Sequence, residues 1–154
     1  MLAIALLTTS ILGGDASVSD AFVVNVSTPR LAAFLQAHPE AVLQATGATL
    51  IARRGDLTRV QKNTAKGLFD WTVRETITQA GHTYSYTAVL ARCDSGNVVD
   101  YRVSCTLSPI GTTQTFIRVI ARMAIDSRRV HDLDVRIGMN AAMEAFRRFM
   151  EGLR

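Results

Sequence analysis

The chain has little of what catalytic and cofactor-binding sites usually need. Its 154 residues contain no P-loop, no dinucleotide-binding glycine pattern and no HExxH motif. It has three histidines, His38, His82 and His131, which are far apart in the sequence and show no metal-ligand spacing. We therefore expect no metal site and no cofactor.

Cysteine is also scarce, with Cys93 and Cys105 the two in the chain. A hairpin turn centred on Ser95-Gly96 pairs residues whose numbers sum to 191. This register places the two cysteines about seven positions apart along the strands, or roughly 20 Å at about 3.3 Å per residue. That distance excludes a disulfide. We expect two free thiols, which counts against an oxidising compartment.

Aromatic residues make up 6% of the chain, and 17 basic against 13 acidic residues give a net charge of +4. Because the charges are scattered and aromatic residues are few, this excess is typical of a solvated basic surface rather than a nucleic-acid interface. Attraction to an anionic lipid surface stays open. The hydrophobic content of 48% and the length are those of one folded domain with a sizeable core.

The first hydrophobic run, Met1–Leu12, is too short to span a bilayer, which takes about 20 apolar residues. It is uncharged, and the small residues after it resemble the end of a secretory signal, with cleavage at Gly14-x-Ala16 or Ser19-x-Ala21. No Lys or Arg precedes the run, so an extra strand or helix packed on the domain is the alternative. We expect residues 1–20 to be a signal peptide or N-terminal extension and 21–154 a single domain. The protein is periplasmic or secreted if residues 1–16 are a signal, and cytoplasmic otherwise.

One strand, Ala21–Ser27, is predicted next, followed by two short helices. The helices, Pro29–Gln36 and Pro39–Ala45, each open with proline near the first turn. Thr28 is the expected cap of the first helix, and Gly47 ends the second. Six strand-like segments follow, at Ala48–Arg54, Leu57–Asn63, Leu68–Thr78, His82–Ala91, Val98–Leu107 and Thr113–Ile125.

A long amphipathic helix over about Arg129–Gly152 closes the chain. Its apolar residues recur at spacings of three and four, as one buried helix face requires. The stripe consists of Val135, Met139, Ala142, Phe146, Phe149 and Leu153, with Met143 and Met150 beside it. The methionines are either an adaptable cavity wall or ordinary core filling.

Register arithmetic on three hairpins gives one common apolar face. The first hairpin turns at Ala80-Gly81, the second at Ser95-Gly96 and the third at Pro109-Ile110-Gly111. A slip of one residue would turn each face inside out, so the agreement predicts a single sheet with one apolar side. The predicted pairs are Trp71–Leu90, Val73–Ala88, Glu75–Tyr86, Ile77–Tyr84, Tyr84–Leu107, Tyr86–Cys105, Leu107–Thr113, Cys105–Thr115, Val103–Ile117 and, in an earlier hairpin, Ile51–Val60; Val99 and Tyr101 continue the face.

Such a sheet lacks a partner layer until the last helix covers its apolar side. A twisted sheet gripped by one long helix tends to enclose a hollow, so the order of elements predicts a container for an apolar molecule. The order, together with Thr83-Tyr84-Ser85-Tyr86 and the Tyr101–Thr113 strand–turn–strand, resembles the helix-grip superfamily, also called SRPBCC or START-like. That superfamily includes lipid-transfer domains, the birch-pollen-allergen group and polyketide cyclases.

The resemblance covers Ala21 to about Leu153. It implies an α+β fold, with a seven-stranded antiparallel sheet, two short helices, a long C-terminal helix and a cavity. It implies no particular reaction, because the superfamily has no universal catalytic residue.

Glu75, Tyr86, Cys105 and Thr115 are predicted to be successive cross-strand neighbours on the inward face. A carboxylate in an apolar cavity is costly unless it accepts hydrogen bonds, and Tyr86 could donate one. Glu75 is then a polar anchor for a ligand hydroxyl or carbonyl, or a general acid or base. The third interpretation is that Glu75 is solvated at the cavity mouth or turned outward by a bulge.

We expect binding or transport of a hydrophobic small molecule, such as a lipid, a sterol-like compound, a quinone or a polyketide, without catalysis. The alternative is a cyclase or dehydratase that uses Glu75 and Tyr86. A third prediction is transient contact with an anionic membrane through the basic residues Arg53, Arg54, Arg59 and Lys62. We expect no nucleic-acid partner. The residues expected to contact the ligand are Phe69, Trp71, Val73, Glu75, Tyr84, Tyr86, Tyr101, Val103, Cys105, Thr115, Ile117, Met139, Met143 and Phe146.

Overall fold

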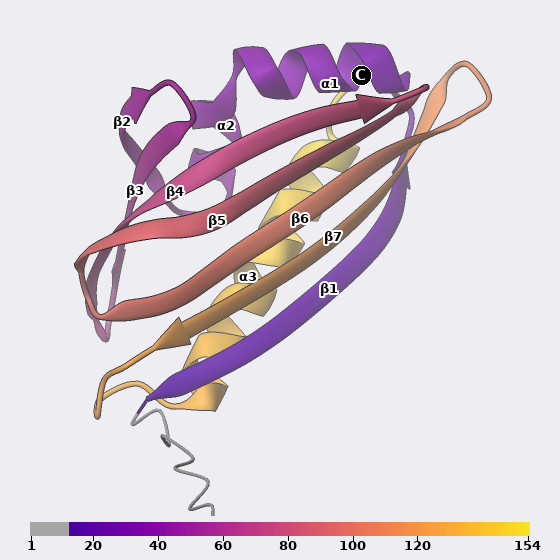
Figure 1. The fold of residues 1–154 in the computed structure, drawn as a ribbon. Coiled ribbons are helices and arrows are strands. Elements are labelled where there is room, and N and C mark those ends of the chain that lie inside the picture. Colours follow the sequence, from indigo (N-terminus) through magenta and orange to yellow (C-terminus); the bar gives the residue numbers. More distant parts are fainter. Residues whose placement is uncertain (1–12) are drawn as a thin grey trace, which may run out of the picture.

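The computed structural model describes residues 13 to 154, whose strands form one antiparallel sheet of seven. The order across the sheet is β1-β7-β6-β5-β4-β3-β2, so the chain crosses from one edge to the other and then returns strand by strand (Figure 1). The elements are β1 (Gly14–Val24), α1 (Thr28–Ala37), α2 (Pro39–Ala45), β2 (Thr49–Arg54), β3 (Leu57–Thr64), β4 (Gly67–Ala80), β5 (Thr83–Ser95), β6 (Val98–Ile110), β7 (Gln114–Ile125) and α3 (Asp132–Glu151). The predicted α+β helix-grip architecture is confirmed.

The long helix α3 covers one face of the sheet, and α1 and α2 make the crossing between β1 and β2 (Figure 1). At its start the carboxylate of Asp134 accepts a hydrogen bond of 2.9 Å from the backbone N–H of His131. This is half of a capping box, which satisfies one of the unpaired donors of a helix N-terminus. The helix therefore begins at Asp132, three residues later than the predicted start at about Arg129.

The backbone of α3 lies far closer to β1 than it does to the central strands β4, β5 and β6. The contact depends on Gly14, where an added Cβ would lie 2.5 Å from the carbonyl oxygen of His131 and 2.5 Å from Cγ2 of Val135. A side chain at residue 14 would force the helix outward. Close packing at one edge of a twisted sheet leaves space between the helix and the middle strands.

The buried apolar residues form two clusters rather than one. The first joins β3 and β4 to the start of α3, with Phe69, Trp71 and Val135 among its members. The second joins α1, β7 and the end of α3, with Leu31 and Met150 among its members. Tyr86 and Val103 touch both clusters. The core is thus dense at its two ends, and the middle of the sheet is the part left for a cavity.

The first strand begins earlier than predicted. In place of Ala21–Ser27, β1 runs from Gly14 to Val24 and pairs with β7 along its whole length, from Gly14 opposite Ile125 to Val24 opposite Thr115. Its first half alternates small inward residues with polar outward ones, an edge pattern that carries little hydrophobic signal. Residue 21 therefore lies inside a strand and does not start the folded domain.

Both cleavage sites suggested by the sequence, Gly14-x-Ala16 and Ser19-x-Ala21, lie within β1, and Ala16 is part of the core. Removal of residues up to 21 would delete most of a strand. The run Met1–Leu12, on which the signal-peptide interpretation rests, lies outside the described residues. Export of the protein stays a prediction.

Two hairpin registers differ from the predicted ones by an even number of residues over most of their length. The exception is the end of β4–β5 near Asp70, where register shifts place Trp71 opposite Cys93 rather than Leu90, an odd difference of three. The β4–β5 turn is Gly81-His82, so Ile77 lies opposite Tyr86 rather than Tyr84. In β6–β7, Leu107 lies opposite Ile117 rather than Thr113, because β6 continues to Ile110. Since strand side chains alternate with period two, shifts of two and four positions keep the same inward face.

The β6–β7 turn was wrongly placed because of Pro109, which lies within β6 opposite Thr115. Proline has no backbone N–H to donate to a neighbouring strand. The β5–β6 ladder already ends at Tyr84 opposite Leu107, so β5 has no residue beside Pro109 that would need this donor. The turn is made instead by residues 111 to 113, with Gly111 at φ 60°.

Bulges account for two other differences. A register shift between Val98 and Asp100 buries Val98 at 2% exposure and leaves Val99, predicted inward, 49% exposed. Another shift between Leu50 and Ala52 places Leu50, not Ile51, opposite Val60. An inserted residue changes the alternation that a period-two pattern assumes.

Candidate ligand cavity

A cavity of about 580 Å³ lies between the inner face of the sheet and the three helices. Its wall is mostly apolar and receives side chains from α1, α2, α3 and strands β2 to β7. Pockets of about 300–1,000 Å³ with apolar walls and a few polar groups are typical of small-molecule sites. The space is therefore large enough for an organic ligand.

The hollow exists because inward positions in the middle of the sheet and on α3 carry small side chains. Ala88 on β5, Ala121 on β7 and Ala142 on α3 all line the cavity, with Gly138 one turn earlier on the helix. The predicted ligand contacts did not include these four residues, although Ala88 and Ala142 were expected on inward faces. Alanine or glycine at inward positions of long, otherwise apolar elements is the signal that would have found them.

Two aromatic pairs contribute rings to the cavity wall. Trp71 packs against Tyr101, with ring centroids 5.3 Å apart, and both line the cavity. Phe146, also on the wall, meets Phe22 edge to face, with centroids 6.2 Å apart. Both arrangements are favourable aromatic geometries, so these rings are held in place without a ligand.

The structure places twelve of the fourteen predicted contact residues on the cavity wall; whether they touch a ligand stays a prediction. The twelve are Phe69, Trp71, Val73, Glu75, Tyr84, Tyr86, Tyr101, Val103, Cys105, Met139, Met143 and Phe146. The other two, Thr115 and Ile117, are 0% exposed and do not line the cavity.

Thr115 is displaced because the β6–β7 register differs by four, which places it opposite Pro109 instead of Cys105. Its hydroxyl donates to the carbonyl of Val26 at 2.7 Å and lies 2.9 Å from that of Thr28. With its one hydrogen used, Thr115 accepts from Thr28. The predicted cap Thr28 therefore ties α1 to β7, while Ser27 occupies the N-cap position without a side-chain cap bond.

A polar group forms one part of the cavity wall around Glu75. Its carboxylate pairs with Arg53 at 3.2 Å, and its side chain is 12% exposed. Glu75 faces Ala88 across the β4–β5 ladder, so Tyr86 is its diagonal neighbour rather than its direct partner. The carboxylate, for which the sequence suggested Tyr86 as a hydrogen-bond donor, thus also has a cation beside it.

Two tyrosine hydroxyls lie near this carboxylate. Burial first, and the Glu75 charge second, raise the pKa of Tyr86 well above its usual 10. The same two causes raise the pKa of Tyr101 to about 12. Both hydroxyls therefore keep their protons at physiological pH and can act as hydrogen-bond donors towards a carboxylate or a ligand oxygen.

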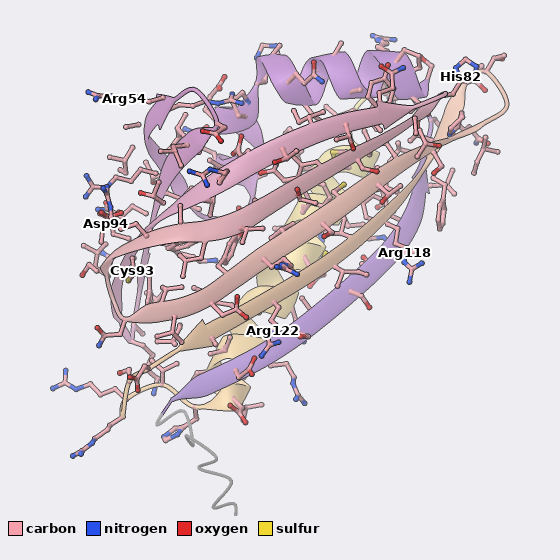
Figure 2. The ribbon with its side chains drawn as sticks, in the orientation of Figure 1. Arg54, His82, Cys93, Asp94, Arg118 and Arg122 are labelled. Atoms are coloured by element: carbon pink, nitrogen blue, oxygen red, sulfur yellow. The ribbon has the colours of Figure 1, made fainter. Side chains whose placement is uncertain are left out.

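The four cations predicted to face a membrane do not form one free basic surface. Arg53 pairs with Glu75 and Arg59 with Asp70, while Lys62 lines the cavity. Arg54 lies at the β2–β3 hairpin (Figure 2) and has no ion pair within residues 13 to 154. Contact with an anionic membrane stays a prediction, and this cluster gives it little support.

Within the described part of the chain, no group of three or more His, Cys, Asp or Glu residues is arranged to hold a metal ion. Both cysteines are free thiols in the structure, as their register predicts. In the same part of the chain, no helix has the length and apolarity needed to span a membrane.

Comparison with known proteins identifies the fold. No protein-family model and no curated protein sequence matches the chain. A START superfamily protein from Mycobacterium smegmatis matches with a TM-score of 0.65 and 17% identity, over 88% of this chain and 94% of that one. The Zhui aromatase/cyclase from Streptomyces sp. R1128 has a TM-score of 0.58 and 10% identity, over 89% of each chain.

Norcoclaurine synthase from Thalictrum flavum, solved with dopamine and hydroxybenzaldehyde, matches with a TM-score of 0.54 and 13% identity, over 100% of this chain and 97% of that one. These likenesses, together with the sheet order and the position of α3, show that the chain has the SRPBCC/START-like helix-grip fold. At identities this low they establish the fold and leave the ligand and any reaction open.

Proposed function

We propose that the protein binds a hydrophobic small molecule in the cavity and carries it without chemical change. The observation that carries this proposal is a mostly apolar space of about 580 Å³ that the chain's own side chains leave unfilled. Protein interiors are normally packed as densely as organic crystals, and a cavity of this size costs stability. A ligand that fills it recovers about 25 cal/mol for each Å² of apolar surface removed from water.

The few polar groups on the wall suit orientation of a ligand better than chemistry. Glu75 is paired with Arg53, and the protonated hydroxyls of Tyr86 and Tyr101 stand next to it. These donors can hold a hydroxyl or carbonyl oxygen of a sterol-like compound, a quinone or a polyketide. A simple lipid would use the apolar wall alone.

An enzyme of the cyclase or dehydratase type is the second candidate. It is favoured by the closeness of Glu75 and Tyr86 within the cavity wall, and the similar folds include an aromatase/cyclase. The ion pair with Arg53 is the observation against it, because a general acid or base must exchange its proton with the substrate.

The test begins with the purified protein, extracted with organic solvent and examined by lipid and native mass spectrometry. A carrier yields a stoichiometric apolar molecule, whose mass also identifies its class. The second arm is titration with the lipophilic probe N-phenyl-1-naphthylamine, comparing Ala142→Phe with Ala141→Phe. Residue 142 lines the cavity, whereas residue 141 is its exposed neighbour on α3.

Carriage in the cavity requires that Ala142→Phe weaken probe binding by about tenfold or more while Ala141→Phe leaves it unchanged. Equal effects of the two variants, or a protein that is empty on extraction and takes up no probe, would count against the proposal.

A further inference from the structure

Lys62 is the charged group of the cavity wall that the proposed function leaves without a role. It lies on β3 opposite Phe69 of β4, half-buried and within the cavity lining. Ala65 and Lys66, in the turn that follows, are exposed and line the same end of the cavity. Lys62 therefore stands near an opening, between water and the apolar interior.

The other charged groups of the wall have partners. Arg53 pairs with Glu75 at 3.2 Å, and Lys66 pairs with Asp134 at 3.6 Å. For Lys62, no carboxylate among residues 13 to 154 lies within ion-pair distance. Its one hydrogen bond runs from Nζ to the backbone carbonyl of Thr46, at 3.2 Å. An ammonium group has three donors, so two remain for another acceptor.

Burial without an anion is unfavourable for this ammonium. Loss of hydration is the cause that lowers the pKa of Lys62 below its usual 10.5, and no neighbouring negative charge offsets it. A partly desolvated cation attracts an anionic partner more strongly than an exposed one does, because the local dielectric constant is lower. The wall therefore offers an unpaired positive charge beside a large apolar space.

We propose that Lys62 holds the anionic end of the bound molecule, so the ligand is an amphiphile with an apolar body and one carboxylate or phosphate group. The inference rests on the proposed function and narrows it from any hydrophobic molecule to an acidic one. The head group lies near the opening at the β3–β4 turn, and the apolar body extends along the sheet towards Tyr84 and Phe146.

A purely structural role for Lys62 makes a different prediction. Thr46 is the C-cap of α2, so the bond from Lys62 also satisfies a carbonyl at the negative end of that helix. If that were its only role, substitution of Lys62 would lower the stability of the protein and weaken the binding of acidic and neutral ligands by the same factor. Lys62→Gln keeps an N–H donor for the carbonyl and removes the charge, so it separates the two roles.

The experiment measures binding of oleic acid and methyl oleate, by displacement of N-phenyl-1-naphthylamine, to the unmodified protein and to Lys62→Gln. A charge-assisted hydrogen bond at Lys62 makes oleic acid bind more tightly than its ester to the unmodified protein. Lys62→Gln then lowers the affinity for oleic acid by about tenfold and leaves the affinity for methyl oleate unchanged. The control is Arg54→Gln, which removes the same charge at an exposed position that does not line the cavity. It should change neither of the two affinities.

A second measurement uses the unmodified protein, so it does not depend on whether a variant folds. Lys62 and Lys66 are the two lysines of the chain, so acetylation by sulfo-NHS-acetate can be followed at each by peptide mass spectrometry. Oleic acid is expected to slow acetylation of Lys62 by several-fold relative to Lys66. Methyl oleate and inorganic phosphate alone are expected to protect neither.

The outcomes separate the two proposals. Tight binding of methyl oleate with no preference for the acid, and no effect of Lys62→Gln, overturns the inference and leaves the carrier intact. Protection of Lys62 by phosphate alone equal to that by oleic acid also overturns it, since the site would then bind free anions. Failure of both oleic acid and methyl oleate to bind overturns the carrier proposal together with the inference.

Discussion

The guanidinium of Arg59 holds the carboxylate of Asp70 with two parallel hydrogen bonds, 2.8 Å from Nε to Oδ1 and 2.7 Å from Nη2 to Oδ2. Asp70 is 3% exposed and accepts a third bond, 3.2 Å long, from the side-chain amide of Gln61. Neither member of the pair lines the cavity. Two-pronged pairing of this kind is stronger and more specific than a single contact, so the pair should stabilise β3 against β4.

We expect Asp70→Asn to lower the free energy of unfolding by about 2 kcal/mol at pH 7, because it breaks hydrogen bonds to a charged, buried group. The hydrogen bond from Arg59 is the main reason that the pKa of Asp70 lies below its usual value. A carboxyl group with a depressed folded-state pKa contributes stability above its unfolded pKa of about 3.9. That contribution is lost as pH falls through the folded-state value.

Urea unfolding between pH 7 and pH 2.5 therefore should show the difference between Asp70→Asn and the unmodified protein shrinking at the acid end. The matched control is Asp56→Asn, which breaks the exposed pair of Asp56 with Arg74 and should cost less than about 0.5 kcal/mol. A difference that stays constant down to pH 2.5 would show that the charge of Asp70 is not the source of its contribution.

Because α3 lies close to β1, any side chain at residue 14 should lower the free energy of unfolding. Gly14→Ala places a methyl group 2.5 Å from both His131 O and Val135 Cγ2, so helix and strand must separate. We expect a loss of about 1–3 kcal/mol, typical of overpacking.

The control for this prediction is Gly138→Ala on α3, where nothing lies within 4 Å of an added Cβ. Alanine is the better helix former, so this variant should gain up to about 1 kcal/mol. Thermal unfolding of the two variants measures both effects, and equal destabilisation by both would contradict the proposed packing.

The arrangement of the fold could be predicted because it depends on patterns that persist through small errors. Turn residues such as Gly55 and Gly81, both at positive φ, mark hairpins, and strand alternation assigns the faces. The β4–β5 and β6–β7 registers were wrong by two and four positions over most of their length, yet the inward face stayed correct there. For the same reason, twelve of the fourteen predicted residues line the cavity.

The errors arose where one residue breaks a regular pattern. A bulge after Val98 exposes Val99, and Pro109 lies in a strand rather than in a turn. Partners distant in the sequence were also beyond prediction. Neither the pairing of Glu75 with Arg53 nor the bond from Lys62 to Thr46 follows from local spacing, because both depend on how β2 and α2 lie beside β3 and β4.

The two thiols are expected to differ in reactivity. Cys105 is buried on the cavity wall, and burial raises its pKa to about 12. At pH 8 its thiolate fraction is then roughly one in ten thousand, far below that of an ordinary cysteine. Cys93 is half-buried near the end of β5.

Ellman's reagent at pH 8 should therefore modify Cys93 in the native protein and leave Cys105 unmodified until denaturant is added. Cys93→Ser and Cys105→Ser identify which thiol reacts. Rapid reaction in Cys93→Ser without denaturant would mean that Cys105 is reached through the cavity and is not shielded as the structure indicates.

Glu75→Gln separates the carrier from the enzyme. It removes the negative charge beside Arg53 but keeps the size of the side chain and its ability to accept a hydrogen bond. A carrier that depends on apolar burial should retain affinity for the molecule recovered by extraction to within about threefold. A cyclase or dehydratase that moves a proton through Glu75 should lose about 100-fold or more in turnover.

Tyr86→Phe completes the comparison, because an enzyme that uses both groups loses turnover with either change. The measurement incubates each variant with the recovered molecule and follows new masses alongside binding. Conversion by the unmodified protein that both substitutions abolish would establish catalysis and displace the carrier proposal. Unchanged mass with retained binding in all three proteins supports carriage, and it would make the pair of Arg53 and Glu75 a polar support of the wall rather than a reacting group.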